Sequence, residues 1–222
     1  MDDAALDLTV VNHPLVRVRL TMLRDENTTM PAFRTLLGQL SGMLVYEAMA
    51  DLTVTPVSVR TPIGPCDGVA VPCDAPPLLV PVLRAGLGML DAALGVLPEA
   101  QTGFVGLARD EETAAPTEYL VSLPENLAGR RVFVLDPMLA TAGSMIHALE
   151  VLERRGADTV TVVCVIGAPE GVAALKDWCA RKDSRKGWRL VIGGIDVGLN
   201  DAAYIVPGLG DAGDRLFGPR NF

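Results

Sequence analysis

The stretch V-F-V-L-D-P-M-L-A-T-A-G-S, residues 132–144, decides more about the fold than any other part of the chain. Its first four residues are apolar and predict a short buried strand, which ends at Asp136. A loop of small residues follows, and apolar residues at helical spacing then predict a helix over 143–155, with Gly156 at its end. The stretch therefore predicts a strand that runs through a small-residue loop into the N-terminus of a helix.

A strand, a loop and a helix N-terminus in this order are typical of a phosphate-binding site. The free backbone N–H groups and the positive end of the helix dipole both favour an anion. Small side chains at 140–144 let the backbone come close to the anion, and Thr141 and Ser144 add hydroxyl donors. The carboxylate of Asp136 is well placed for a sugar hydroxyl or a metal ion. The segment thus predicts a phosphorylated, ribose-like ligand.

The same succession of strand, loop and helix recurs along the chain. Strands are predicted at 78–83, 103–108, 117–122, 131–135, 159–166 and 189–196, and helices at 31–50, 86–94, 143–155 and 169–180. This alternation predicts an α/β fold with a mostly parallel sheet flanked by helices. Ligands bind such sheets beyond the carboxyl ends of the strands. The loops after residues 83, 108, 135 and 196 should therefore form the site.

Two segments lie outside this pattern. Residues 1–30 have mixed character and are predicted to form an arm. Pro56 argues against a central strand at 53–59, and residues 60–77, with five prolines, are predicted to be a turn-rich excursion. The length of 222 residues suggests a single domain.

Composition excludes several classes of function. The net charge of −8 argues against a nucleic-acid partner, which needs a basic face. The four cysteines lack C-x-x-C spacing, so neither a disulfide framework nor a zinc site is expected, and two histidines argue against a multi-histidine metal site or a Ser-His-Asp triad. The N-terminus does not resemble a signal peptide, and no apolar run approaches the roughly 20 residues that span a bilayer. We expect a cytoplasmic protein with no membrane partner.

Two loops at predicted strand ends carry an arginine. Arg84 stands beside Gly86 and Gly88, which allow a tight loop. Such an arginine can bind an oxyanion with paired donors, or it can cap a helix or bridge to a surface carboxylate. Arg109 precedes three acidic residues. This charged run is either a solvated face or a mobile flap that brings Arg109 over a substrate.

The tail Y-I-V-P-G-L-G-D-A-G-D-R-L-F-G, residues 204–218, is rich in glycine. This composition predicts no regular structure. Such a backbone can present N–H and C=O groups to a small planar polar ligand, and Asp211 and Asp214 add carboxylates. A floppy tail is the alternative, but floppy tails are usually polar, whereas this one is apolar with an aromatic anchor at Phe217.

Residues 136–144 resemble the phosphoribosyl-diphosphate-binding signature of the type I phosphoribosyltransferases. Further motifs narrow the resemblance to the uracil phosphoribosyltransferases: N-H-P-L-V (12–16), Y-E-A-M-A-D-L (46–52), V-P-V-L-R-A-G-L-G-M (80–89), R-D-E-E-T (109–113), D-P-M-L-A-T-A-G-S (136–144) and the tail at 204–218. They extend over nearly the whole chain, from about residue 12 to 218. A lone phosphate loop would be weak, but ordered motifs that include a base-binding tail are specific.

The resemblance implies a role for each of these loops. Asp136 would lie near the ribose hydroxyls, the following loop would hold the 5′-phosphate, and Arg84 and Arg109 would bind diphosphate. The catalytic residues it implies are Asp136, Arg109 and Asp211; those that bind phosphoribosyl diphosphate are Arg84, Arg109, Asp136, Pro137, Met138, Leu139, Ala140, Thr141, Ala142, Gly143, Ser144 and Asp211; those that bind uracil are Ile205, Gly210, Asp211 and Ala212. No residue is assigned as a metal ligand, although Asp211 would lie near substrate-carried magnesium.

The resemblance also implies an enzyme, a reaction and an assembly. A uracil phosphoribosyltransferase transfers phosphoribosyl from 5-phospho-α-D-ribose 1-diphosphate to uracil, giving UMP and diphosphate in pyrimidine salvage. It is a Mg²⁺-dependent pentosyltransferase and a homo-oligomer, dimeric or higher, and some members are activated by GTP. The implied fold is a core over about 78–200 with a hood formed by about 1–30 and 201–222.

Ala142 departs from the family pattern, which usually has glycine at this position. Alanine adds a methyl group and disfavours positive φ. We expect the loop not to need positive φ at 142, because Gly143 and the rest of the loop are intact. On this view Ala142→Gly changes the affinity for phosphoribosyl diphosphate by less than about tenfold, roughly 1.4 kcal/mol.

Two other classes of function match parts of the pattern. A non-catalytic regulator that binds UMP and controls RNA or a partner would need a basic surface face, which an acidic chain does not predict. A nucleotide-binding dehydrogenase would need G-x-G-x-x-G after its first strand, and the chain has none there.

Overall fold

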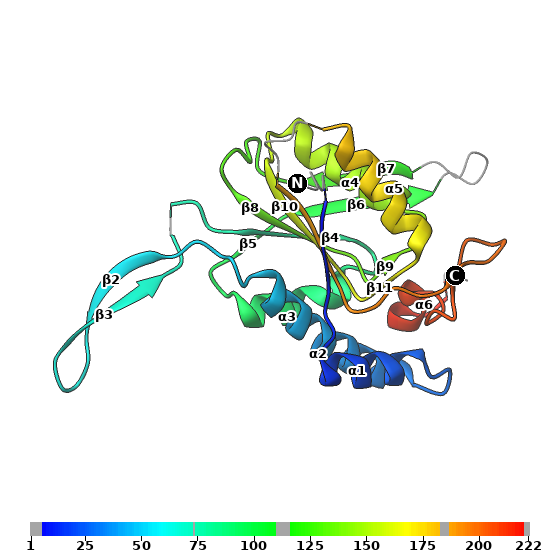
Figure 1. Ribbon diagram of the computed structural model, residues 1–222, viewed down its shortest axis with the longest axis horizontal. Coiled ribbons are helices and arrows are strands. Elements are labelled where there is room, and N and C mark those ends of the chain that lie inside the picture. The colour runs from blue at the N-terminus through cyan, green and yellow to red at the C-terminus, as the bar shows by residue number, and fades with distance from the viewer. Residues whose placement is uncertain (1–5, 73, 110–115, 183–186, 220–222) are drawn as a thin grey trace, which may run out of the picture.

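The centre of the protein is an eight-stranded sheet, seen in a computed structural model that describes residues 6–72, 74–109, 116–182 and 187–219 (Figure 1). The strand order is β1-β12-β10-β8-β4-β6-β7, with the short β5 beside β4, and every pairing is parallel except that of β6 with β7. The strands are β1 (Asp7–Val10), β4 (Leu78–Leu83), β5 (Gln101–Thr102), β6 (Phe104–Arg109), β7 (Pro116–Ser122), β8 (Arg131–Leu135), β10 (Thr159–Cys164) and β12 (Gly187–Ile192).

Helices cover both faces of this sheet (Figure 1). On one face lie α4 (Gly143–Arg154) and α5 (Pro169–Ala180); on the other lie α1 (Pro14–Arg24), α2 (Met30–Ala48) and α3 (Leu87–Val96). Side chains of β8 alternate between the two resulting cores: Val134 packs with the α4 layer, and Phe133 and Leu135 pack with the α2 layer. Each fully buried side chain of this size contributes about 1.5–3 kcal/mol. Burial on both sides therefore fixes β8 firmly and, with it, the start of the loop at Asp136.

Short elements complete the fold. They are the hairpin β2 (Thr55–Arg60) and β3 (Pro65–Ala70), the parallel pair β9 (Met138–Leu139) and β11 (Ile166–Gly167), the antiparallel pair β13 (Gly198–Leu199) and β14 (Ile205–Val206), and helix α6 (Ala212–Phe217). The β2–β3 hairpin projects away from the sheet (Figure 1). Among the described residues, no helix is both long and apolar enough to cross a membrane.

The α/β fold with a mostly parallel sheet is confirmed. The predicted helix 169–180 agrees with α5, and the predicted strand 78–83 agrees with β4 despite Pro81. The register explains this tolerance: β4 pairs with β5 through residues 78–79 and with β6 through residues 82–83, so the proline lies in the break between the two partners.

Two sequence predictions are wrong in part. The arm predicted for residues 1–30 contains β1, which pairs in parallel with β12 at the sheet edge, and α1, which begins at Pro14 after the cap His13. The short alternating run V-R-V-R-L belongs to this helix because Val16, Leu20 and Leu23 are buried on one side of it. The tail predicted to lack regular structure contains β14 and α6, since Asp211 caps the helix by accepting a hydrogen bond from the Asp214 N–H.

The loop after β4 approaches the end of β8 so closely that only glycine fits at position 86. A Cβ atom there would lie 2.2 Å from the Leu135 carbonyl oxygen and 2.7 Å from the Val82 backbone. We expect Gly86→Ala to lower the free energy of unfolding by about 1–3 kcal/mol through overpacking, measured by urea unfolding. Gly95→Ala is the matched control, because a Cβ in this part of α3 meets nothing within 4 Å. It should raise stability by about 0.5–1 kcal/mol; equal effects of the two changes would contradict the prediction.

Candidate active site

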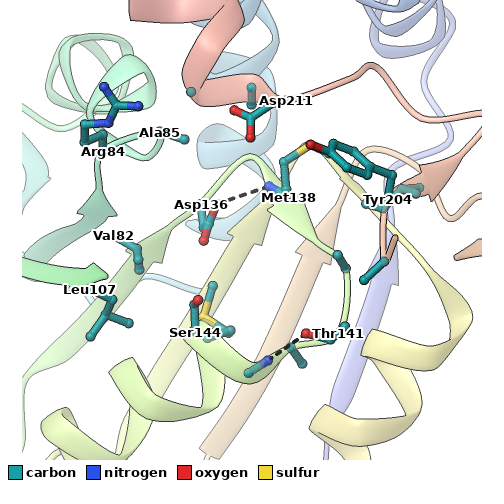
Figure 2. A pocket seen from close by; sticks show the side chains of 18 of the residues that line it. Val82, Arg84, Ala85, Leu107, Asp136, Met138, Thr141, Ser144, Tyr204 and Asp211 are labelled. Atoms are coloured by element: carbon teal, nitrogen blue, oxygen red, sulfur yellow. Dashed lines mark hydrogen bonds between the residues drawn. The ribbon is translucent and has the colours of Figure 1, made fainter. Parts of the chain in front are cut away.

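A cavity of about 460 Å³ lies at the carboxyl ends of β4, β6 and β8 (Figure 2). Three of its walls come from the loop after β4, the loop that leads into α4, and the chain between β13 and α6. The lining residues are Val82, Leu83, Arg84, Ala85, Leu107, Asp136, Met138, Ala140, Thr141, Ala142, Gly143, Ser144, Met145, Ala202, Ala203, Tyr204, Ile205, Gly210, Asp211, Ala212 and Gly213. The sheet thus brings together segments that are far apart in the sequence, at the edge where parallel sheets bind ligands.

The floor of the cavity includes the N-terminus of α4. Residue Ala142 is its N-cap and has no capping side chain, the first turn carries no acidic residue, and the Thr141 hydroxyl accepts only a long hydrogen bond of 3.5 Å from the Gly143 N–H. The first N–H groups of a helix have no partner within the helix. Thr141 and Ser144 line the same wall, as Figure 2 shows. These features create a place for an anion, in which backbone N–H groups and the positive end of the helix dipole both act.

Ala142 adopts a left-handed conformation, with φ 65° and ψ 0°. The expectation that the loop needs no positive φ here is therefore wrong. The residue must turn the chain from the loop into α4, and its carbonyl accepts the first helical hydrogen bond, from Ile146 N–H. Because this conformation is part of the folded chain, its cost lowers the stability of the fold.

A balance of small terms explains why alanine can stand at this position. Its left-handed conformation costs about 1–2 kcal/mol. Ala142 is only 5% exposed and belongs to the core beneath α4, so its methyl group contributes about 0.8 kcal/mol. Glycine would also lose about 0.5–1 kcal/mol of conformational entropy on folding. The terms nearly cancel.

Asp136 follows β8 and faces the cavity beside Met138, whose N–H donates a hydrogen bond of 3.2 Å to the carboxylate (Figure 2). Burial raises the pKa of Asp136 to about 7, and the hydrogen bond from Met138 only partly opposes this. The carboxyl group is therefore poised to change charge near neutral pH, and a ligand that donates hydrogen bonds or carries a cation would favour its ionised form.

Arg84 brings a positive charge to the opposite side of the cavity. Its Nε is buried and has no hydrogen-bond partner among the described residues. The guanidinium lies 3.9 Å from the Asp214 carboxylate and 5.9 Å from the centroid of the Phe217 ring. Neither contact is a hydrogen bond, so donors are left for an oxyanion. The alternative of a bridge to a surface carboxylate is present as the long contact with Asp214, whereas the free Nε favours the anion-binding interpretation of Arg84 over a helix cap.

The remaining wall is mostly backbone. Ile205 lies at the start of β14, and Gly210, Asp211 and Ala212 lead into α6. Gly208 between them has φ 65°, and a Cβ there would lie 2.1 Å from the Ile205 carbonyl oxygen. Because of this close turn, the residues before Gly208 and those after it both line the cavity.

Most of the predicted site residues meet at this cavity. Arg84, Asp136, Met138, Ala140, Thr141, Ala142, Gly143, Ser144, Ile205, Gly210, Asp211 and Ala212 line it. Pro137 and Leu139 do not; both are buried, and their carbonyl oxygens bond to the backbone of residues 165–168. Arg109 ends β6, but its side chain and the predicted flap at 110–115 lie outside the described residues.

Some lining residues were not predicted. Tyr204 reaches the cavity just before β14, as Figure 2 shows, and Ala202 and Ala203 line it from the same turn between β13 and β14. Leu107 reaches it from β6. Tyr204 could have been predicted, because it is an aromatic residue directly before the predicted site residue Ile205. Leu107 gave no such signal, because an apolar residue near a strand end reads as core.

The carboxylates at the cavity match magnesium only if the substrate completes the coordination. The described residues contain no group of three or more His, Cys, Asp or Glu side chains that could hold a metal. Asp136 and Asp211 both line the cavity and offer hard oxygen donors. Mg²⁺ is commonly bound through one or two carboxylates together with substrate phosphates and water. The donor set therefore fits a substrate-carried ion.

A parallel sheet whose central strand passes through a small-residue loop into a helix N-terminus, with an acidic residue before the loop and an arginine opposite, defines a type I phosphoribosyltransferase. The family model described as uracil phosphoribosyltransferase matches residues 10–219. The uracil phosphoribosyltransferase of Corynebacterium efficiens is 52% identical over 216 residues, which cover 97% of this chain and 99% of that protein. That of Corynebacterium glutamicum strain R is 51% identical over the same coverage.

A solved structure agrees with these relatives. The AQ2163 protein from Aquifex aeolicus superimposes with a TM-score of 0.88 at 37% identity, covering 97% of this chain and 100% of that one. The chain belongs to the uracil phosphoribosyltransferase family. The family predicted from the ordered motifs is confirmed, and the chain is an enzyme of the pentosyltransferase class.

We expect Ala142→Gly to change the free energy of unfolding by less than about 1 kcal/mol, because relief of strain is offset by the lost methyl burial and by the entropy of glycine. Ala203→Gly is the matched control: Ala203 also has positive φ, 61°, but it is not part of the core. It should gain about 0.5–1 kcal/mol. Urea unfolding of both variants measures the difference, and a larger gain at 142 than at 203 would contradict the analysis.

Asp136→Asn should become more stable relative to the original protein as pH rises. A carboxyl group whose pKa is raised from 3.8 to about 7 by folding opposes folding increasingly between those two values, and the opposition is constant above pH 7. Asparagine does not ionise. We expect the stability difference between variant and original protein to grow by about 2–3 kcal/mol from pH 5 to pH 8, measured by urea unfolding without substrate. A difference that does not change with pH would show that Asp136 titrates normally.

Proposed function

We propose that this enzyme transfers the phosphoribosyl group of 5-phospho-α-D-ribose 1-diphosphate to uracil, giving UMP and diphosphate in pyrimidine salvage. One observation carries the proposal: a single cavity joins the N-terminus of α4, the half-buried side chain of Arg84 and the wall formed by Ile205 and residues 210–212. These three features suit, in turn, a phosphate, a diphosphate leaving group and a planar base. The curated relatives over nearly the whole chain bear the matching name.

The assignment of roles follows the walls of the cavity. Residues 140–144 hold the 5′-phosphate, with residues 137–139 shaping the loop that presents them. The carboxylate of Asp136 accepts hydrogen bonds from the ribose hydroxyls. Arg84 holds the diphosphate, and Arg109 at the end of β6 closes over it.

The base is held by the opposite wall. Ile205, Gly210 and Ala212 present backbone groups to the edge of uracil, and Asp211 also faces phosphoribosyl diphosphate. A wall of fixed donors and acceptors rejects cytosine, because its amino group replaces the O4 acceptor and leaves a buried polar group unpaired.

Catalysis by this arrangement is a matter of position and charge. Cleavage at the anomeric carbon builds positive charge on the ribose and negative charge on the departing diphosphate. Arg84 and Arg109 stabilise the negative charge, and Asp136 and Asp211 supply negative potential near the ribose. Mg²⁺ bound to the substrate would neutralise the diphosphate further. No strong nucleophile is needed, because the cavity holds the base and the ribose in contact.

The same proposal covers the wider organisation of the protein. The chain acts as one domain of residues 1–222, with a core at about 78–200 and a hood from about 1–30 and 201–222. In support, Arg215 of α6 donates hydrogen bonds to the carbonyl oxygens of Leu23, Asp25 and Thr28. A homo-oligomeric state, activation by GTP and a cytoplasmic location stay predictions.

The experiment is an assay of diphosphate release from phosphoribosyl diphosphate. Uracil should support release in the presence of Mg²⁺, cytosine and hypoxanthine should support at least about a hundredfold less, and removal of Mg²⁺ should abolish it. Arg84→Gln should raise the KM for phosphoribosyl diphosphate by about tenfold or more, as loss of a charged hydrogen bond predicts. No uracil-dependent release by the original protein would defeat the proposal.

A further inference from the structure

The segment that forms the base-binding wall is held by a buried ion pair that does not itself line the cavity. Asp196, after β12, accepts two hydrogen bonds from the Arg24 guanidinium, of 2.7 Å and 2.5 Å. The Asp196 side chain is only 7% exposed, and that of Arg24 is 26% exposed. Arg24 is the last residue of α1. Residues separated by 172 positions in the chain therefore meet in one bidentate pair.

Both partners of this pair also bind the same residue, Gly208. Its N–H donates a 2.8 Å hydrogen bond to Asp196 Oδ2, and its carbonyl oxygen accepts a 2.8 Å hydrogen bond from Arg24 Nη1. Gly208 is the tight turn with positive φ between Ile205 and Gly210, and the latter two residues line the cavity. The ion pair thus binds both the N–H and the carbonyl oxygen of Gly208. This residue lies between Ile205 and Gly210, the two residues of the turn that line the cavity.

The pair is itself anchored to the sheet and to α1. The Asp196 N–H donates a 2.8 Å hydrogen bond to the Gly167 carbonyl oxygen in β11. Val16, Leu20 and Leu23 bury α1 against the core, so Arg24 projects from a fixed helix end. Burial alone would raise the pKa of Asp196, but the hydrogen bonds from Arg24 and Gly208 outweigh it and hold this pKa below the usual value. Asp196 is ionised throughout the neutral range.

We propose that Asp196 and Arg24 are positioning residues for the base, which fix the Gly208 turn so that the backbone groups at 205 and 210–212 meet the edge of uracil. The inference rests on the proposed function. Backbone groups select a base only if they are held in place before it binds, since a misplacement of about 1 Å costs a large part of the interaction. The site for the 5′-phosphate at α4 is formed by a different wall and does not depend on this turn. Asp211 faces phosphoribosyl diphosphate from the same wall as the base, but its carboxylate is held by the Asp214 N–H within α6 and not by Gly208.

The test compares Asp196→Asn, Arg24→Gln and the double variant with a matched control, Asp51→Asn. Asp51 forms a similar bidentate pair with Arg131, at 2.8 Å and 3.2 Å, but it lies at the other end of β8, away from the cavity. The KM for each substrate and kcat are measured. Urea unfolding confirms that every variant is folded, and amide hydrogen exchange at 205–212 reports the order of the wall.

We expect each single variant to raise the KM for uracil about tenfold, to leave the KM for phosphoribosyl diphosphate within about twofold, and to speed amide exchange at Gly208. The double variant should be no worse than the worse single variant, because both act through one turn. Asp51→Asn should match the original protein. If Asp196→Asn does not fold, Arg24→Lys replaces it. Lysine keeps the positive charge but cannot make the paired hydrogen bonds of the guanidinium, so this variant should raise the KM for uracil about threefold.

Three results would overturn the inference. They are a KM for uracil within about twofold of the original in both single variants, an equal rise in the KM of both substrates, and effects that multiply in the double variant. Failure of the proposed function looks different, because the original protein would then show no uracil-dependent release. In that case faster amide hydrogen exchange at Gly208 in the variants would still show that the ion pair orders this turn.

Discussion

Burial of both faces of the central sheet is the constraint on which the rest of this structure depends. Two layers of helices cover it, so the strands between them must be apolar on both sides and parallel strands must end at one edge. Polar residues such as Asp136 follow the strands at that edge, because the chain leaves the core there. The same burial limits water around Asp136 and raises its pKa to about 7. Stability and the chemistry of the site thus have one origin.

The walls of the cavity include many residues with small side chains, which leave backbone groups open to a ligand. At one end an uncapped helix N-terminus presents N–H groups, and at the other a turn at Gly208 brings the peptide groups of the tail inward. Charged side chains are few, chiefly Arg84, Asp136 and Asp211 among the described residues. Such a site suits a ligand that has a charged phosphate part and a neutral planar part.

Backbone sites need external support, and here it comes from contacts between distant parts of the chain. Arg24 at the end of α1 and Arg215 in α6 each bind several carbonyl oxygens or carboxylates across the gap between the N-terminal and C-terminal segments. The guanidinium of Arg215 also stacks over Phe33, 4.4 Å from the ring centroid. Arginine suits this role because its planar fork makes several directed hydrogen bonds at once. The tail that lines the cavity is therefore held by α1 and the turn after it, which pack in the same core as the tail.

The sequence by itself determined the α/β class and the strand–loop–helix around Asp136, because hydrophobic periodicity and small-residue loops act over a few residues. Most of the residues that line the cavity were indicated by the resemblance of the ordered motifs to a family. Tertiary structure alone decided the positive φ of Ala142, the strand and helix within residues 1–30, and the helix α6 in a tail that looked irregular. It also decided the grip of Asp196 and Arg24 on Gly208. Helices α1 and α6 do have local signals, the caps His13 and Asp211, but burial against the rest of the core decides that these segments are helical. The strand β1 and the ion pair depend on partners far away in the chain, and no local pattern records them.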